Sequence, residues 1–425
     1  MKINNNYNPL FSNKKINYNF FLKLLYNLIR IFKFIIKNKI KIIIILNFFL
    51  IIYKSSFYYK KKSKISREIY NLIKKINNYI IICKNGKLLK KINIYSLNPK
   101  VSVIISSYNS AKTIKSSIRS IENQNMSEVE IILVDDFSTD NTLEIIEELR
   151  KEDSRIKIIK NAENKGALFS KSIGALNAKG KYLFFLDSDD LFINKNILNI
   201  CYNEAEKNID IIEFSGVTSS TEILDINQIP KIPYYLRFKN NNEIIVQPEL
   251  SNFIYQKEND EIIKLIDGYI WGKCIKTKII RKVLEYLGDW IYKEKVNYGD
   301  DRIINFVLFK IAYSFKFIEE FGLIYYENNA FSISNSLTNI SRCHDELINI
   351  MSIFNITKNT NDISIVIYEL NFRWDWIIIP GLNKKNKEYA KKLLIQIINT
   401  KLLSKNEKIK IKLFLKELNN YTFFE

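Results

Sequence analysis

The sequence predicts an α/β fold in which a mainly parallel sheet has helices on both faces. Two observations predict it. Short apolar runs alternate with amphipathic segments of about ten residues between Val101 and Leu186, a pattern typical of repeated strand–helix–strand units. Acidic clusters follow two of the apolar runs, and in such sheets ligands bind at the carboxyl ends of the strands.

The predicted elements follow one another regularly along the chain. Strands are expected at 101–106, 129–134, 156–160 and 182–186, and helices at 113–123, 142–150 and 167–177. The strand segments are rich in Val, Ile and Leu, as expected of strands that are buried on both faces. Asn141 and Thr142 provide a polar start for the second helix.

Composition limits the kind of protein. The chain has 425 residues, of which 47% are hydrophobic, so it can bury a sizeable core in one large or two medium domains. Its net charge of +20 fits either a general bias toward lysine or an anionic partner. No RNA-binding motif or zinc-finger spacing accompanies the charge, so no specific nucleic-acid partner is expected. Metal or acid–base chemistry must depend on carboxylates, because the chain has one histidine, His344, and four widely spaced cysteines: Cys83, Cys201, Cys274 and Cys343.

The two ends of the chain differ from the α/β region. Residues 1–41 are basic, and residues 42–59 are apolar enough to predict a short transmembrane anchor, with an interfacial or core helix as the alternative. Residues 60–99 would form a basic, partly helical stem. Residues 341–425 predict helices that pack on the core or lie against a membrane. We therefore expect a single-pass protein anchored in an endomembrane, either the Golgi or the endoplasmic reticulum.

The acidic clusters predict a metal site. Asp135 and Asp136 follow the second strand, and the run Asp187-Ser188-Asp189-Asp190 follows the fourth. Carboxylates brought to one edge of a sheet repel one another unless a cation compensates. Magnesium and manganese prefer carboxylate and phosphate oxygens. The sequence therefore predicts a divalent metal and a substrate that carries a diphosphate.

The same region resembles a known family. The stretches 101–109, 121–124, 134–142, 164–174 and 179–190 closely resemble family 2 glycosyltransferases. Weaker similarity continues through 271–273, 299–301, Phe306, Tyr326 and 332–334, which leaves 1–99 and about 341–425 outside. The resemblance implies a GT-A fold, a nucleotide-diphosphate sugar donor, with a UDP-sugar favoured, and manganese or magnesium.

The resemblance also implies roles for residues of a nucleotide-sugar-binding core at 100–216. Asp136 would hold the nucleobase, with Tyr108 lining the pocket and Asp135 nearby. Lys171 stands where the family usually has an arginine near the donor. Within the DxD motif formed by Asp187, Ser188 and Asp189, the first carboxylate would face the ribose or the metal-bound phosphates, and the third residue would bind the metal directly.

Residues 217–340 would form the acceptor-binding part of the domain. Asp301 matches the family's catalytic base, although its neighbour Asp300 is an alternative and a purely helix-capping role is another. Trp271 would stack on an acceptor sugar or belong to the core. These features predict an inverting, metal-dependent glycosyltransferase that acts on a glycan, protein or lipid acceptor.

The sequence departs from the family pattern at several positions. Ser106 replaces a usual proline and Phe137 a frequent glycine, and residues 328–331 lack the basic residue that often precedes the Ser332 motif. This last departure favours an alternative function, in which a catalytically degenerate relative binds nucleotide-sugar or glycan without transferring sugar.

Overall fold

The structure is a computed structural model that describes residues 79–84, 87–93, 99–219, 244–247, 255–258, 261–264, 269–326 and 337–421. The chain divides into two compact units, Met1–Ile94 and Tyr95–Glu425. The predicted basic segment and membrane anchor at 1–59 lie outside the described residues. Within the described ranges, no helix has both the length and the apolar character that crossing a bilayer requires.

The described part of the first unit is a β-hairpin. Strand β1 (Tyr79–Lys84) pairs antiparallel with β2 (Lys87–Asn93). These two segments of the predicted, partly helical stem are therefore strands, and the rest of residues 60–98 lies outside the described residues. β-Branched and aromatic residues at 79–82 favour a strand, and the Asn85-Gly86 pair between the strands is typical of two-residue hairpin loops.

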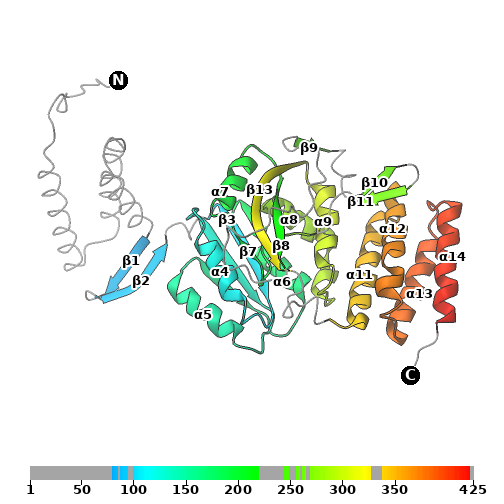
Figure 1. Ribbon diagram of the computed structural model, residues 1–425, viewed down its shortest axis with the longest axis horizontal. Helices are drawn as coiled ribbons and strands as arrows, with labels where there is room; N and C mark the ends of the chain where they lie inside the picture. Colours follow the sequence, from blue (N-terminus) through cyan, green and yellow to red (C-terminus); the bar gives the residue numbers. More distant parts are fainter. Residues whose placement is uncertain are drawn as a thin grey trace, which may run out of the picture. The chain divides into compact units, whose positions relative to one another are not determined.

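The second unit is built on a mixed sheet of nine strands (Figure 1). One half is parallel and confirms the predicted strands, in the order β5 (Ile156–Lys160), β4 (Val129–Asp135), β3 (Val101–Ser107) and β6 (Tyr182–Phe185). The other half continues with β12 (Lys273–Lys276), β8 (Ile211–Ser219), β13 (Ser314–Tyr326) and β7 (Leu191–Phe192), and β9 (Ile244–Val246) pairs with β13. β12 is antiparallel to both of its neighbours. A separate hairpin comprises β10 (Tyr255–Glu258) and β11 (Glu261–Lys264).

Helices cover both faces of the sheet, as predicted, because successive residues of each central strand point to opposite sides. Val103 and Ile105 of β3 belong to one core, whereas Ile104 between them belongs to the other. The first core includes side chains of α4 (Ile114–Glu122), α5 (Thr142–Glu152) and α7 (Ile197–Ala205), and the second includes side chains of α6 (Ala167–Asn177), α8 (Thr277–Leu287) and α9 (Asp300–Ile311). Gly174 lets α6 approach β3 closely, since a Cβ atom there would lie 2.4 Å from Ile104 Cγ2.

The C-terminal region is helical, as predicted, and shares the α9 core. It consists of α11 (Asn339–Thr357), α12 (Ser364–Arg373), a π-helical turn η7 (Trp374–Ile378), α13 (Lys384–Ile398) and α14 (Lys405–Asn420), with short 3₁₀ turns η5 (Asp289–Tyr292) and η6 (Asn361–Ile363) elsewhere in the unit. Ser404 and Glu407 form a capping box that fixes the start of α14.

Candidate active site

The polar segments that follow the central strands lie on one edge of the sheet. β3 lies between β4 and β6 and runs parallel to both, so the segments after these three strands emerge together. The Oγ atoms of Ser110 and Ser188 are 2.8 Å apart, and Ser117 Oγ donates to the backbone oxygen of Ser188 at 2.9 Å. The structure thus joins the loop after β3 to the acidic run after β6.

Asp136 is a buried carboxylate that organises the neighbouring loop. Its Oδ1 accepts hydrogen bonds from Asn161 Nδ2 at 2.7 Å and from the backbone N–H of Lys165 at 2.9 Å. Its Oδ2 accepts from the Gly166 N–H at 2.7 Å. An ionised carboxylate has about four acceptor positions, so these three bonds leave it capacity for one more donor. A nucleobase N–H is a suitable donor, and this role stays a prediction.

Asp135 and Phe137 flank that carboxylate. Asp135 Oδ2 accepts from the Ser138 N–H at 3.3 Å, whereas its buried Oδ1 has no hydrogen-bond partner among the described residues. Tyr108 is half-buried at the end of β3. Phe137 has a φ of 67°, in the left-handed region that favours glycine. This conformation explains why a glycine is frequent at this position in the family that the sequence resembles.

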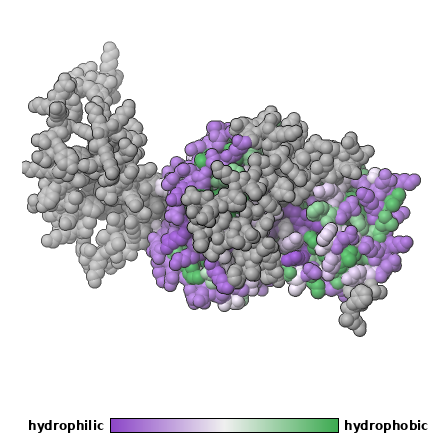
Figure 2. Space-filling view, in the orientation of Figure 1, coloured by the Kyte–Doolittle hydropathy of each residue, from purple (hydrophilic) through white to green (hydrophobic). Residues whose placement is uncertain are grey.

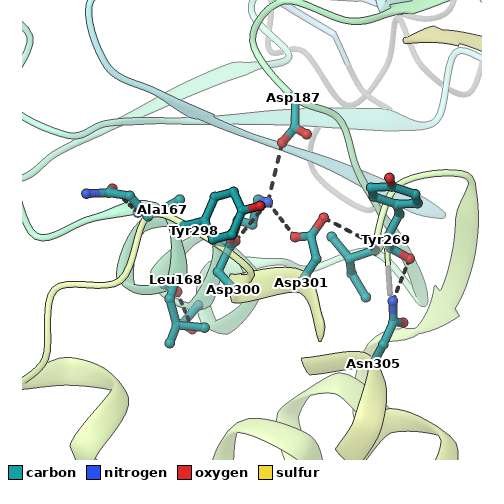
Figure 3. Close-up of polar contacts among 12 residues, drawn as sticks. Ala167, Leu168, Asp187, Tyr269, Tyr298, Asp300, Asp301 and Asn305 are labelled. Atoms are coloured by element: carbon teal, nitrogen blue, oxygen red, sulfur yellow. Dashed lines mark hydrogen bonds and ion pairs between the residues drawn. The ribbon is translucent and has the colours of Figure 1, made fainter. Parts of the chain in front are cut away.

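A buried lysine joins three carboxylates from two different segments. Lys171 of α6 lies with its Nζ 2.6 Å from Asp301 Oδ1, 2.9 Å from Asp300 Oδ2 and 3.4 Å from Asp187 Oδ1 (Figure 3). Burial alone would lower the pKa of Lys171, but the three carboxylates raise it well above its ordinary value. The lysine therefore stays charged and links the loop after β6 to the start of α9.

The two aspartates at the start of α9 have different environments. Burial, with added repulsion from Asp301 and Asp187, raises the pKa of Asp300 to about 7 against the pull of Lys171. Asp301 Oδ2 accepts from the Ile270 N–H at 3.3 Å, so both of its oxygens are positioned. Gly299 adopts φ 69° just before the helix, and the N-terminal end of α9 further favours negative charge.

The DxD motif provides hard oxygen donors at the same edge. Asp187 and Asp189 are half-buried. Asp190 is buried, accepts from the Tyr326 N–H at 3.4 Å and has an Oδ2 without a hydrogen-bond partner in the described part of the chain. No group of three His, Cys, Asp or Glu side chains is placed to hold a metal ion within the described ranges. The donors nevertheless fit magnesium or manganese, which need only one or two carboxylates when a diphosphate provides further oxygens.

Trp271 belongs to an aromatic cluster. Its side chain is only 7% exposed. Its ring stacks on Tyr269, with centroids 4.8 Å apart, and on Tyr325, with centroids 5.7 Å apart. Both tyrosines are half-buried, so they offer more surface to a ligand than the tryptophan does. Stacking of Trp271 on an acceptor sugar stays a prediction.

Two sets of charged residues that belong to no sequence motif position α9. Asp345 of α11 accepts from the N–H groups of Asn297 and Tyr298 at 2.9 and 3.0 Å. These residues immediately precede the Gly299-Asp300-Asp301 turn. A buried ion network also joins α9 to the C-terminal helices; its members are Arg302, Glu346, Glu369 and Arg373. Glu369 and Arg373 are four residues apart on α12, but the other partners lie tens of residues apart, so no local sequence signal identifies those pairs.

Ionisation of Asp345 should make the stability of the folded protein depend on pH. Burial raises its pKa from 3.8 to about 6, against the two backbone hydrogen bonds. The folded protein then binds this proton more tightly than the unfolded chain does. The resulting stability is fully present below about pH 4 and is lost as the pH rises through about 6. Two pKa units correspond to at most about 3 kcal/mol.

Asp345→Asn keeps the accepting oxygen but cannot ionise. We expect the free energy of unfolding of this variant to decline less between pH 4 and pH 7 than that of the wild type. Denaturant titrations at both pH values measure the difference. Identical pH dependence in the two proteins would contradict this assignment.

Comparison with known proteins shows which family part of the chain is similar to. The family model described as "Glycosyl transferase family 2" matches residues 102–264. Residues 102–264, which are less than half of the chain, therefore match family 2 glycosyltransferases. This confirms the resemblance that the strand-end motifs predicted.

Two relatives illustrate the extent of similarity of this glycosyltransferase domain. A Bacillus subtilis protein named "Uncharacterized glycosyltransferase EpsJ" is 28% identical over 243 residues, which cover 57% of this chain and 64% of that protein. An Escherichia coli protein named "UDP-Glc:alpha-D-GlcNAc-diphosphoundecaprenol beta-1,3-glucosyltransferase WfaP" is 44% identical over 108 residues, 25% of this chain and 42% of that protein. The chain therefore spans less than two thirds of the length of either relative.

A solved structure supports the fold of the glycosyltransferase domain. Staphylococcus aureus TarS, in a crystal structure with UDP-GlcNAc, aligns with a TM-score of 0.53 at 16% identity and covers 77% of this chain and 93% of that one. This likeness confirms the predicted GT-A fold of the mixed sheet.

Proposed function

We propose that the chain is an inverting, metal-dependent glycosyltransferase that transfers a sugar from a nucleotide-diphosphate donor to an acceptor hydroxyl. One observation carries the proposal. At the carboxyl edge of the sheet, Lys171 joins the DxD residue Asp187 to Asp301 on α9. The residues that we propose for donor binding and for proton abstraction therefore share one ion-pair partner.

Asp301 would act as the base. The acceptor hydroxyl attacks the anomeric carbon, the bond from that carbon to the diphosphate oxygen breaks, and the hydroxyl proton passes to the Asp301 carboxylate. A single displacement of this kind inverts the anomeric configuration. The Lys171 Nζ lies 2.6 Å from Asp301 Oδ1 and positions this carboxylate. Asp300, whose pKa is about 7, would mainly hold Lys171 in place.

Asp189, with Asp187, would hold the metal. Manganese or magnesium bound there supplies a positive charge that stabilises the departing diphosphate. Lys171 is a compact point charge and cannot form the bidentate contact that an arginine makes with a phosphate. Its contacts with three carboxylates support a positioning role for this residue.

The donor is proposed to be a UDP-sugar and the acceptor a glycan, with a lipid-linked glycan favoured over a glycoprotein. The Escherichia coli relative is named for UDP-Glc and a diphosphoundecaprenol acceptor. A Campylobacter jejuni relative, 34% identical over 133 residues that cover 28% of this chain and 43% of that protein, is also named for an undecaprenol-linked acceptor. The predicted endomembrane location stays a prediction.

The alternative is a degenerate relative that binds donor without transfer. It is favoured by the missing basic residue at 328–331, a segment outside the described residues. Thermal unfolding and nucleotide release with UDP-sugars, with and without manganese, separate the two functions. Donor binding stabilises by about 2.7 kcal/mol at a hundredfold excess over the dissociation constant in either case, but only an enzyme releases UDP.

We expect the wild type to release UDP with manganese, and to do so poorly with a chelator. Asp189→Ala should lose this activity, whereas Asp289→Ala, at an exposed position of η5, should keep it. Equal UDP release from all three proteins would contradict the proposed enzyme, and stabilisation without any release would support the binding protein.

A further inference from the structure

The last two helices are strongly basic. Residues 384–421 contain eleven lysines and three glutamates. Four large apolar side chains are also exposed in this segment: Ile395 at 43%, Leu402 at 49%, Ile409 at 48% and Leu413 at 59%. We call the surface formed by these four residues and the neighbouring lysines the C-terminal basic surface. Figure 2 shows apolar patches among hydrophilic side chains over this end of the unit.

The apolar side chains on α14 are not part of the core. The helix buries Ile411 and Leu418 against the rest of the unit. Ile409 and Leu413 are one helical turn apart, so they share a face. At 100° per residue, that face is opposite to the buried one. Two neighbouring, exposed aliphatic side chains on this outer face, at 48% and 59% exposure, are available for contact with a partner.

Lysines surround this row. Lys405 lies one turn before Ile409, and Lys412 and Lys416 lie three residues after Ile409 and Leu413. All three are exposed and form no ion pair with any described residue. On α13, Lys391 and Lys392 precede Ile395 by one turn. Both helices therefore combine apolar and cationic groups on their outer sides.

We propose that the C-terminal basic surface docks on an anionic phospholipid membrane. Ile409 and Leu413 would enter the boundary between headgroups and acyl chains. The long lysine side chains would lie along that boundary with their ammonium groups on the lipid phosphates. A second copy of this surface is a poor partner because the like charges would repel. The inference is independent of the proposed sugar transfer.

A fluorophore at the surface tests the proposal locally. In the full chain with Cys83→Ser, Leu413→Cys is labelled with a polarity-sensitive dye; the other three cysteines are buried. Lys115→Cys, at an exposed position of α4, is the matched control. Vesicles of phosphatidylcholine with phosphatidylglycerol should shift the emission of the label at 413 to the blue and leave that at 115 unchanged. Pure phosphatidylcholine vesicles should have little effect on either.

The charge contribution is tested by the triple variant Lys405→Gln, Lys412→Gln, Lys416→Gln, which should weaken vesicle binding by about fivefold per lysine.

Three results would overturn the proposal. One is an unchanged label at 413 while the protein sediments with anionic vesicles, since another segment would then bind. The second is the same blue shift with soluble polyglutamate, which would indicate an acidic polymer. The third is a triple variant that binds as tightly as the wild type.

Discussion

Asp301→Asn is expected to lower the rate of sugar transfer by about 10²–10⁴-fold, which is the usual contribution of a general base. Asparagine has nearly the same size and can still accept the Ile270 N–H, but it cannot take a proton from the acceptor. UDP release with manganese, a saturating donor and water as the sugar acceptor measures the rate. Donor binding, followed by thermal shift, should change little, because the proposed donor contacts lie on other residues.

A matched control is Asp362→Asn. Asp362 also forms an ion pair with a lysine, Lys310, but far from the sheet edge on the 3₁₀ turn η6. Its loss should leave the rate within about twofold, since ion pairs that are partly open to solvent contribute little. If Asp301→Asn transfers sugar at the wild-type rate while Asp300→Asn does not, the base is Asp300.

Lys171→Met should destabilise the second unit by about 3–5 kcal/mol. The substitution leaves Asp187, Asp300 and Asp301 close together without their shared cation, and Asp300 is buried. Thermal unfolding measures the effect, with an expected loss of roughly 10 °C. The loss should diminish below about pH 7, where protonation of Asp300, whose pKa is raised by burial to about 7, relieves the repulsion.

Two further variants serve as controls for this prediction. Lys171→Arg keeps the charge and should lose much less stability. Lys181→Met removes a surface ion pair with Glu206 in which the lysine is 55% exposed, and it should cost no more than about 1 kcal/mol. Unfolding of Lys171→Met at the wild-type temperature would show that the carboxylates do not depend on this lysine.

The parallel half of the sheet could be predicted from the sequence because its signals are local. The strands β3, β4, β5 and β6 are short apolar runs, and helices of matching length separate them. The other half could not be predicted in the same way. β13 pairs parallel with β8, with Phe315 opposite Ile211, across about a hundred residues that carry no local pairing signal. In the stem, the sequence predicted a basic, partly helical segment, whereas residues 79–84 and 87–93 form two antiparallel strands.

The site residues also divide into those that have a local sequence signal and those that do not. The acidic residues after β4 and β6 were identified because they follow recognisable strands. Lys171 was identified by its position in a motif, but its contacts with Asp300 and Asp301 required the fold that brings α6 beside α9. Asp345 had no motif. A buried carboxylate is recognisable as a positioning group only when the N–H groups that it accepts from are known.

The most direct test is a crystal structure of the protein with UDP and manganese. We predict uracil beside Tyr108 and Asp136, and the diphosphate on a metal held by Asp189. The account would be contradicted if the nucleotide bound elsewhere on the chain, or if this edge of the sheet stayed empty at a saturating nucleotide concentration.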